Sequence, residues 1–277
     1  MGKLLTEQQV ADYARDGFVT PVRAFGPQTA AAYRARLQAY EQECGGPIRA
    51  NMRHKVHLLF TWAAELIRHP RILDAVEDLI GPHLLCWSTN FFIKEANDPS
   101  FVSWHQDSTY WGLEPPDVVT AWLALSEAPV ASGAMAFLPG SHLRGQLDHA
   151  DTFDPDNLLT RGQRIAAPME TAGAVAAPLK AGEFSLHHVR LVHGSEPNRT
   201  GDRRIGLAIR YVAAHVRPEK AARSATLVRG IDQFGHFDPE PAPVLDLDAE
   251  ALATHERVMK GQLSALYSGT DIRTARD

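Results

Sequence analysis

Two hydrophobic periodicities divide the chain. In the first eighty residues, apolar positions recur three and four residues apart, which favours helices. Thr6 and Gln9 form a capping-box pattern that begins a helix, and a second helix is expected from Pro27 to a Gly-Gly pair. Residues 61–80 predict two helices, with the break at Pro70. The N-terminal part is therefore expected to be helical to about residue 82.

From about residue 83 the period changes to two. Short segments rich in β-branched and aromatic residues, bounded by turn residues, predict strands at 84–94, 118–126, 134–138, 182–186 and 205–214. Several such strands are typical of a sandwich or barrel of the jelly-roll kind. We expect one domain over 1–277, with a β core at about 83–215 and a C-terminal helix at about 248–267.

Composition narrows the class of protein. The 28 basic side chains against 33 acidic ones, with a net charge of -5, argue against a nucleic-acid surface or a polybasic membrane patch. No apolar run is long enough to cross a bilayer, and the N-terminus lacks a signal-peptide stretch. Cys44 and Cys86 are expected to be buried free thiols. We expect a cytoplasmic protein that acts on a small molecule, without a nucleic-acid or membrane partner; the oligomeric state stays open.

The segment SWHQDSTYW carries the first candidate chemistry. His105 and Asp107 lie two residues apart, so at a strand end both side chains would point the same way. An imidazole and a carboxylate supply two-thirds of the facial triad that holds Fe(II) and leaves three positions for a 2-oxoacid and O₂. The H-x-D pattern alone is common by chance, so further residues must support it.

The segment 191–211 supplies that support. His193 precedes a Gly-Ser turn and could be the third ligand, from a strand end far along the chain. Arg204 begins the next strand and shares its parity with Arg210, so both could face the interior. A buried arginine needs a partner, and a dicarboxylate cosubstrate suits its bidentate fork. The alternative for Arg204 is an ordinary surface or salt-bridged arginine.

Four motifs occur in one order: WHQD at 104–107, TAWLAL at 120–125, PGSH at 139–142, and HGS-x-PN from 193 followed by an arginine. With these motifs the chain resembles the phytanoyl-CoA dioxygenase family of Fe(II)/2-oxoglutarate oxygenases, through about Tyr211. The resemblance implies a mainly β fold with flanking helices, a double-stranded β-helix (jelly roll, cupin-like). It also implies Fe(II), 2-oxoglutarate and O₂ as cofactor and cosubstrates, with His105, Asp107 and His193 as the iron ligands.

The resemblance further implies a cosubstrate pocket. Arg204 would pair with the C5 carboxylate of 2-oxoglutarate, Ser195 would also bond that carboxylate, and Trp122 would pack against the cosubstrate. Asn90 and Lys94 lie in the strand before the motif, where similar enzymes place cosubstrate contacts. The alternative for Lys94 is a charge that protects an edge strand.

The reaction type also follows from the resemblance. Halogenating members replace the ligand carboxylate by a small residue, so Asp107 makes hydroxylation of an unactivated C–H the expected outcome. Desaturation and ring formation stay open. Two alternatives lie outside this chemistry: a metal-dependent hydrolase, because two histidines and a carboxylate also suit zinc, and a non-catalytic cupin-like binding protein.

Candidate substrate contacts lie in two places. Tyr110 and Trp111 follow the motif closely enough to line the pocket, with core packing as the alternative. Arg53 and His57 belong to a basic segment that would favour an anionic group such as phosphonate, phosphate or carboxylate if it covered the pocket. The alternative is a solvated basic helix start. Of the pair at 187–188, strand geometry lets one histidine point inward.

Overall fold

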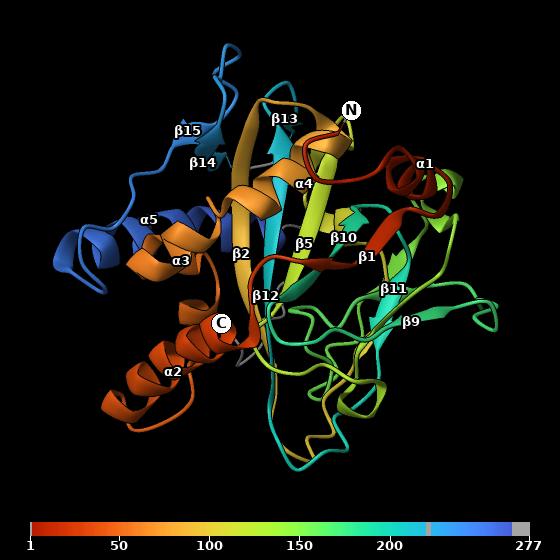
Figure 1. The fold of residues 1–277 in the computed structure, drawn as a ribbon, viewed down its shortest axis with the longest axis horizontal. Coiled ribbons are helices and arrows are strands. Elements are labelled where there is room, and N and C mark those ends of the chain that lie inside the picture. Colours follow the sequence, from red (N-terminus) through yellow and green to blue (C-terminus); the bar gives the residue numbers. More distant parts are fainter. Residues whose placement is uncertain (1, 220–222, 268–277) are drawn as a thin grey trace.

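The computed structural model describes residues 2–219 and 223–267 (Figure 1). The described α-helices are α1 (Glu7–Asp16), α2 (Pro27–Glu43), α3 (Thr61–Leu66), α4 (Pro70–Ile80) and α5 (Ala249–Leu266). The capping box at Thr6 is present, α2 begins at Pro27 and α4 begins at Pro70. The individual helices predicted in the first eighty residues, with the break before Pro70, are therefore confirmed.

Two antiparallel sheets form the core. The larger has seven strands in the order β1 (Phe18–Arg23), β10 (Glu183–His188), β5 (Val118–Ala124), β12 (Arg204–Ala213), β2 (Leu84–Lys94), β14 (Ser224–Arg229) and β15 (Asp238–Pro239), of which only the last pair is parallel. The smaller has the order β3 (Val102–His105), β11 (His193–Ser195), β6 (Met135–Phe137) and β9 (Val175–Ala177). Two further pairs join β13 (Arg217–Pro218) to β4 (Leu113–Glu114) and β7 (His149–Ala150) to β8 (Arg164–Ile165). The fold is a jelly roll with flanking helices, as predicted.

Residue parity divides the two faces of the seven-stranded sheet. Odd-numbered residues of β5 and β12, such as Val119 and Leu207, pack in one hydrophobic core with Trp62 of α3 and Val76 of α4. Figure 1 shows α2, α3 and α4 gathered on one side of the molecule, away from β9 and β11. Even-numbered residues therefore face the smaller sheet, which places polar side chains of β5 and β12 between the sheets.

Gly206 shows how closely the packing fits on that inner face. A Cβ atom at this position would lie 1.9 Å from the Trp122 ring, so the indole rests directly on the glycine backbone. Gly206 lies in β12 and Trp122 in the neighbouring strand β5, with Gly206 opposite Ala124 and Ala208 opposite Trp122. The absence of a side chain at 206 thus fixes where the Trp122 ring lies.

Two sequence predictions need adjustment. Cys86 is buried in β2, but Cys44 lies exposed just after α2, so the expectation of two buried thiols is wrong for Cys44. It is the C-cap residue of α2 and lies in an exposed stretch at 42–45. The expectation of a helical part to about residue 82 also needs correction, because the strand β1 lies within it and belongs to the larger sheet.

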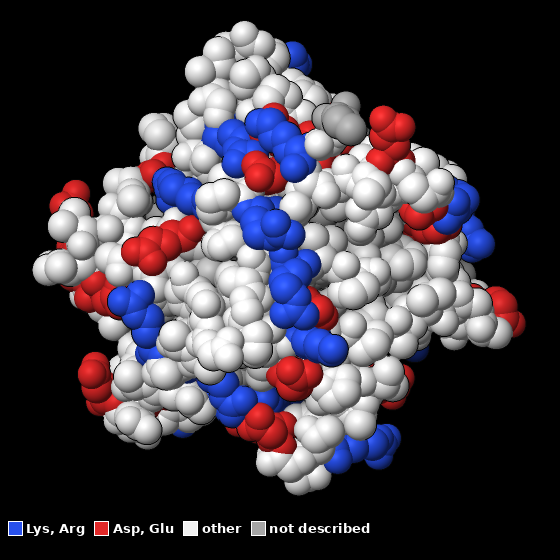
Figure 2. Space-filling view, in the orientation of Figure 1, with Lys and Arg blue, Asp and Glu red and all other residues white. Residues whose placement is uncertain are grey.

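The surface carries charges of both signs. On the face shown in Figure 2, basic side chains form a central row with acidic side chains beside it. Typical pairs are Arg229 with Glu77, 2.8 Å apart, and Arg23 with Glu183, 2.6 Å apart. Among the described helices, none has both the length and the apolar character needed to cross a bilayer.

Candidate metal centre

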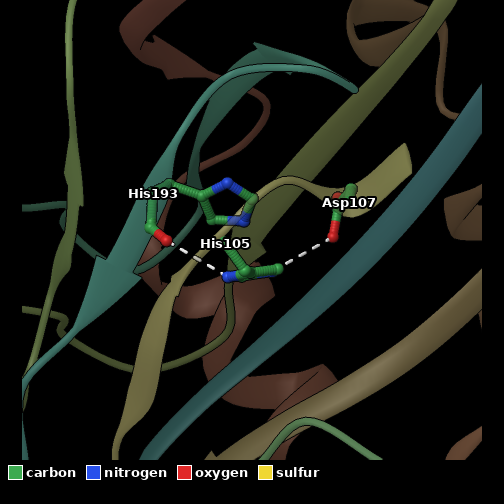
Figure 3. Close-up of side chains that lie close together, drawn as sticks. All are labelled: His105, Asp107 and His193. Carbon is green, nitrogen blue, oxygen red and sulfur yellow. Dashed lines mark hydrogen bonds and ion pairs between the residues drawn. The ribbon is translucent and has the colours of Figure 1, made fainter. Parts of the chain in front are cut away.

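Three metal-ligating side chains meet between the sheets. His105 ends β3, His193 begins β11, and the two residues lie opposite each other in antiparallel register. Asp107 lies beyond the strand, in a short 3-10 helix (Asp107–Tyr110), and its Oδ1 is 3.4 Å from His105 Nε2. The ligand atoms of all three lie within 4.8 Å of one another (Figure 3). The turn after the strand, rather than strand alternation, brings the carboxylate to the imidazoles.

Backbone carbonyls orient both imidazoles. His105 Nδ1 lies 2.9 Å from Ser103 O and 3.1 Å from His193 O, and His193 Nδ1 lies 2.9 Å from Leu191 O. A carbonyl can only accept, so each Nδ1 carries the proton and each Nε2 keeps a lone pair for a metal. Figure 3 shows His105 between the other two residues, joined to each by a dashed line.

The charge states also suit metal binding. Burial alone would raise the pKa of Asp107, but the neighbouring His105 and His187 outweigh it and hold the pKa well below the usual range. Burial, together with the nearby His105, keeps the pKa of His193 well below its usual value. An ionised carboxylate beside a neutral imidazole is the donor set that a divalent cation requires.

The carboxylate has two further neighbours. Thr120 Oγ1 donates to Asp107 Oδ2 at 3.2 Å, and His187 Nε2 lies 3.6 Å from the same oxygen. His187 is the inward member of its pair: it is buried opposite Thr120, with its ring 4.6 Å from that of His193. His188 instead packs against Tyr13 of α1. Thr120 was missed because nothing in the sequence says which strand lies beside Asp107.

Gln106, between the first two ligands, was also missed. Its fully buried amide donates to the carbonyls of Gly145 and Arg190 at 2.9 and 2.7 Å and accepts from Leu147 N at 2.7 Å. This residue therefore ties the metal-binding turn to two loops. Its position within the WHQD motif is the only sequence signal for that role.

One end of the pocket around the triad, the inner pocket, is cationic. Arg204 lines it, is 1% exposed, and lies with its guanidinium carbon 5.1 Å from the centre of the Trp122 ring. One guanidinium nitrogen donates to Gly133 O. Ser195 and Trp122 line the same pocket. Arg204 is thus neither a surface arginine nor a salt-bridged one among the residues described.

Lys94 stands behind Ser195. It lies opposite Arg204 in the strand register, is fully buried, and its Nζ donates to Ser195 Oγ at 2.7 Å. Because that oxygen accepts from the lysine, the serine proton is free to donate into the pocket. Burial, reinforced by Arg204, lowers the pKa of Lys94 to about 6. The edge-strand alternative for Lys94 is wrong, since the side chain is fully buried and bonded to Ser195.

A second cavity, the outer pocket, adjoins the inner one and shares Asp107 and Arg210 with it. Asn90, Arg53, Tyr110 and Trp111 line this outer pocket. The structure therefore places Asn90 away from the Arg204 end, contrary to its expected grouping with Lys94. The Tyr110 hydroxyl donates to Asp151, and Trp111 lies 5.0 Å from Trp87 between ring centroids.

His57 is not brought to either pocket. It is 1% exposed, and its Nε2 lies 3.1 Å from Glu240 Oε2. Lys55, in the left-handed region with φ 49°, separates two 3-10 helices, so Arg53 turns toward the outer pocket while Lys55 and His57 turn inward to Glu240. The prediction that His57 contacts the substrate is therefore wrong.

Comparisons with known proteins identify the family and the fold. The sequence model of the family described as phytanoyl-CoA dioxygenase (PhyH) matches residues 13–206. A Stutzerimonas stutzeri protein named "probable alpha-ketoglutarate-dependent hypophosphite dioxygenase" is 32% identical over 58% of the chain, which spans 57% of that relative's length.

Two solved structures share the fold. The apo form of ThoJ, a non-heme monooxygenase, is 37% identical with a TM-score of 0.83, over 93% of this chain and 97% of that one. The epimerase SnoN, in complex with Fe³⁺, alpha-ketoglutarate (2-oxoglutarate) and nogalamycin RO, is 27% identical with a TM-score of 0.63, over 76% and 85%.

Proposed function

The chain belongs to the phytanoyl-CoA dioxygenase family, and from that premise we propose an Fe(II)- and 2-oxoglutarate-dependent dioxygenase that hydroxylates an unactivated C–H of a small metabolite. The observation that carries the proposal is one pocket with a His-Asp-His site and, at its end, a buried arginine without a carboxylate partner among the described residues. A dicarboxylate that chelates the metal at one end and pairs with the arginine at the other fits both features.

Each residue has a defined part in this proposal. His105, Asp107 and His193 would hold Fe(II), which with 2-oxoglutarate and O₂ supplies the oxidising chemistry and releases succinate and CO₂. Arg204 would bind the distal carboxylate of the cosubstrate, and Ser195 would donate its free hydroxyl proton to the same group.

The remaining residues position these groups. Lys94 holds the hydroxyl oxygen of Ser195, and Trp122, seated on Gly206, forms the apolar wall beside Arg204. Thr120 donates to Oδ2 of Asp107, which leaves Oδ1 for the metal. Exclusion of water by this buried pocket strengthens each of these polar contacts.

Hydroxylation is proposed over the two alternatives for separate reasons. The carboxylate of Asp107 occupies the position that a halide would need. A zinc hydrolase would use the three ligands but leaves Arg204 and its neighbour Lys94 without a purpose. A binding protein on the same fold would retain iron and cosubstrate without turning them over.

Oxygen dependence tests the proposal. With Fe(II), 2-oxoglutarate and a panel of small molecules, we expect succinate only under O₂, and the active compound should gain one ¹⁸O atom from ¹⁸O₂. Product formation that continues anaerobically would favour the hydrolase. Iron and cosubstrate binding without succinate release under any condition would favour the binding protein.

A further inference from the structure

Arg210 lies at the junction of the inner and outer pockets and is not used by the cosubstrate proposal. It projects from β12 with the same parity as Arg204 and lines both pockets. The side chain is 6% exposed, and one guanidinium nitrogen donates to Asn90 Oδ1 at 2.8 Å. Its Nε is buried and has no hydrogen-bond partner among the described residues. A buried guanidinium whose described partners include a neutral amide but no carboxylate in salt-bridge contact has unused binding capacity.

The junction of the two pockets carries one acid and one base among the described residues. Asp107 and Arg210 line both pockets, and Asp107 belongs to the proposed metal site. His54 adds no charge, because burial lowers its pKa to about 3. The neutral ring accepts from Asn90 Nδ2, so the amide is held in place with its oxygen toward Arg210. Where the two pockets meet, Arg210 therefore presents a cation that is held by a neutral amide.

The aromatic lining does not offset this charge. The Arg210 guanidinium lies 5.0 Å from the Trp111 ring centre and 5.9 Å from that of Phe92. Arg161 lies 4.1 Å from the centre of the Tyr110 ring. Because these ring faces already contact protein cations, they are poor sites for a cationic substrate. They instead hold the arginines in a fixed orientation.

We propose that Arg210 binds an anionic oxygen group of the substrate, a carboxylate or a phosphonate, and thereby holds the substrate beside the metal. This inference rests on the proposed function, since it assigns the substrate class of that same site. Because Arg210 lines the inner pocket as well, the oxidised carbon should lie within a few bonds of the anionic group. In this proposal Arg204 binds a carboxylate of the cosubstrate, and Arg210 binds the anionic group of the substrate.

The test compares ligands of one carbon skeleton by isothermal titration calorimetry on the anaerobic Fe(II)–2-oxoglutarate protein. The probes share a benzyl group: phenylacetate, its neutral amide phenylacetamide, the cation phenethylamine, and benzylphosphonate as a second anion. We expect the anions to bind at least about tenfold more tightly than the amide, from one charge-assisted bidentate contact. Arg210→Gln should remove this preference, whereas Arg36→Gln, at an exposed arginine of α2, should retain it.

A second variant protects the test against misfolding. Asn90→Asp preserves the side-chain volume and places a carboxylate 2.8 Å from the Arg210 guanidinium, if the geometry is kept. It should abolish the anion preference without removing the arginine. Retention of the preference in both variants, or equal binding of phenylacetate and phenylacetamide to the unaltered protein, would overturn the proposal. Failure of both anions to bind at millimolar concentration would count against it equally.

The same samples separate this proposal from the general one. The visible charge-transfer band of the Fe(II)–2-oxoglutarate complex is recorded before each titration. An unaltered protein without the band contradicts the proposed function, whatever the probes do. A present band with no anion preference contradicts only the role of Arg210. A loss of 2-oxoglutarate affinity in Arg210→Gln, with the probe preference intact, would reassign this arginine to the cosubstrate and overturn the inference.

Discussion

Two clusters of buried basic side chains lie beside the larger sheet. We call a cluster complete when its basic side chains contact a carboxylate of the chain, and only one of the two is complete. In the first, Lys55 and His57 both contact Glu240. In the second, Lys94 and Arg204 lie side by side on β2 and β12, and among the described residues no carboxylate is within salt-bridge distance of either. The comparison distinguishes buried charges that stabilise the fold from buried basic side chains that are available to bind a ligand.

In the complete cluster, both carboxylate oxygens of Glu240 have hydrogen-bond partners. One oxygen of Glu240 accepts from Lys55 and from Ser224 at 2.7 Å, and the other accepts from Thr226 at 2.9 Å and contacts His57 at 3.1 Å. Burial alone would raise the pKa of Glu240, but Lys55 and His57 outweigh it and lower the pKa to about 2. Such a network joins the 50–58 segment to the end of the sheet and leaves no site open.

The incomplete cluster has the opposite character. Burial lowers the pKa of Arg204 to about 10, and no opposite charge nearby reverses that shift. Two cations side by side in a dry site are unfavourable, so the pKa of Lys94 stays near 6 unless an anion arrives. Two buried basic side chains beside a metal site therefore indicate an anionic ligand more clearly than any single motif.

The largest expected effect comes from opening the complete cluster. Lys55→Met should lower the free energy of unfolding by about 3–5 kcal/mol, because Glu240 loses its main counter-charge while buried. Urea denaturation followed by circular dichroism measures this loss. Lys180→Met, at an exposed lysine, is the control and should change stability by less than about 0.5 kcal/mol. A loss of that small size in Lys55→Met would show that the cluster is not a structural unit.

The matching substitution in the incomplete cluster should act in the opposite way. Lys94→Met removes a buried amine that burial and Arg204 keep from holding its charge, so the free protein should be as stable as the original or slightly more so. Its affinity for 2-oxoglutarate should fall about tenfold, because Ser195 loses its positioning bond and the carboxylate loses a nearby charge. Calorimetry of binding and urea unfolding of the same sample test both halves. Strong destabilisation with unchanged affinity would make Lys94 a structural residue.

A smaller effect is expected in the pH dependence of cosubstrate binding. The pKa of Lys94 is about 6 in the free protein, and an arriving carboxylate should raise it. Between these two pKa values, binding takes up a proton, so affinity should fall as pH rises above about 6, by at most about tenfold per pH unit. Below pH 6 this dependence should vanish, since the lysine is charged in both states.

Calorimetry in buffers of different ionisation enthalpy measures the proton uptake directly. The Lys94→Met variant is the matched control and should lose the dependence above pH 6. An unaltered protein whose affinity is flat from pH 6 to pH 8 would show that Lys94 does not change its charge on binding.

The sequence predicted what depends on local pattern. The shared parity of Arg204 and Arg210 placed both on the inner face, and the WHQD motif indicated the metal site. It could not predict partners set by long-range packing, such as Glu240, which lies 183 residues from His57. It also misjudged the direction of His57, because the turn at Lys55 needs a left-handed backbone that periodicity does not reveal.

The central claim is that the His-Asp-His site and Arg204 together form a cosubstrate site. An anaerobic titration of the apoprotein with Fe(II) and then 2-oxoglutarate tests it most directly, by the weak visible metal-to-ligand charge-transfer band. His105→Ala and Arg204→Ala are titrated beside it, with His215→Ala as a control at an exposed histidine. We predict a band that disappears in the first variant, needs far more 2-oxoglutarate in the second, and is unchanged in the third. Folded, iron-loaded protein that shows no band at saturating 2-oxoglutarate would contradict the account.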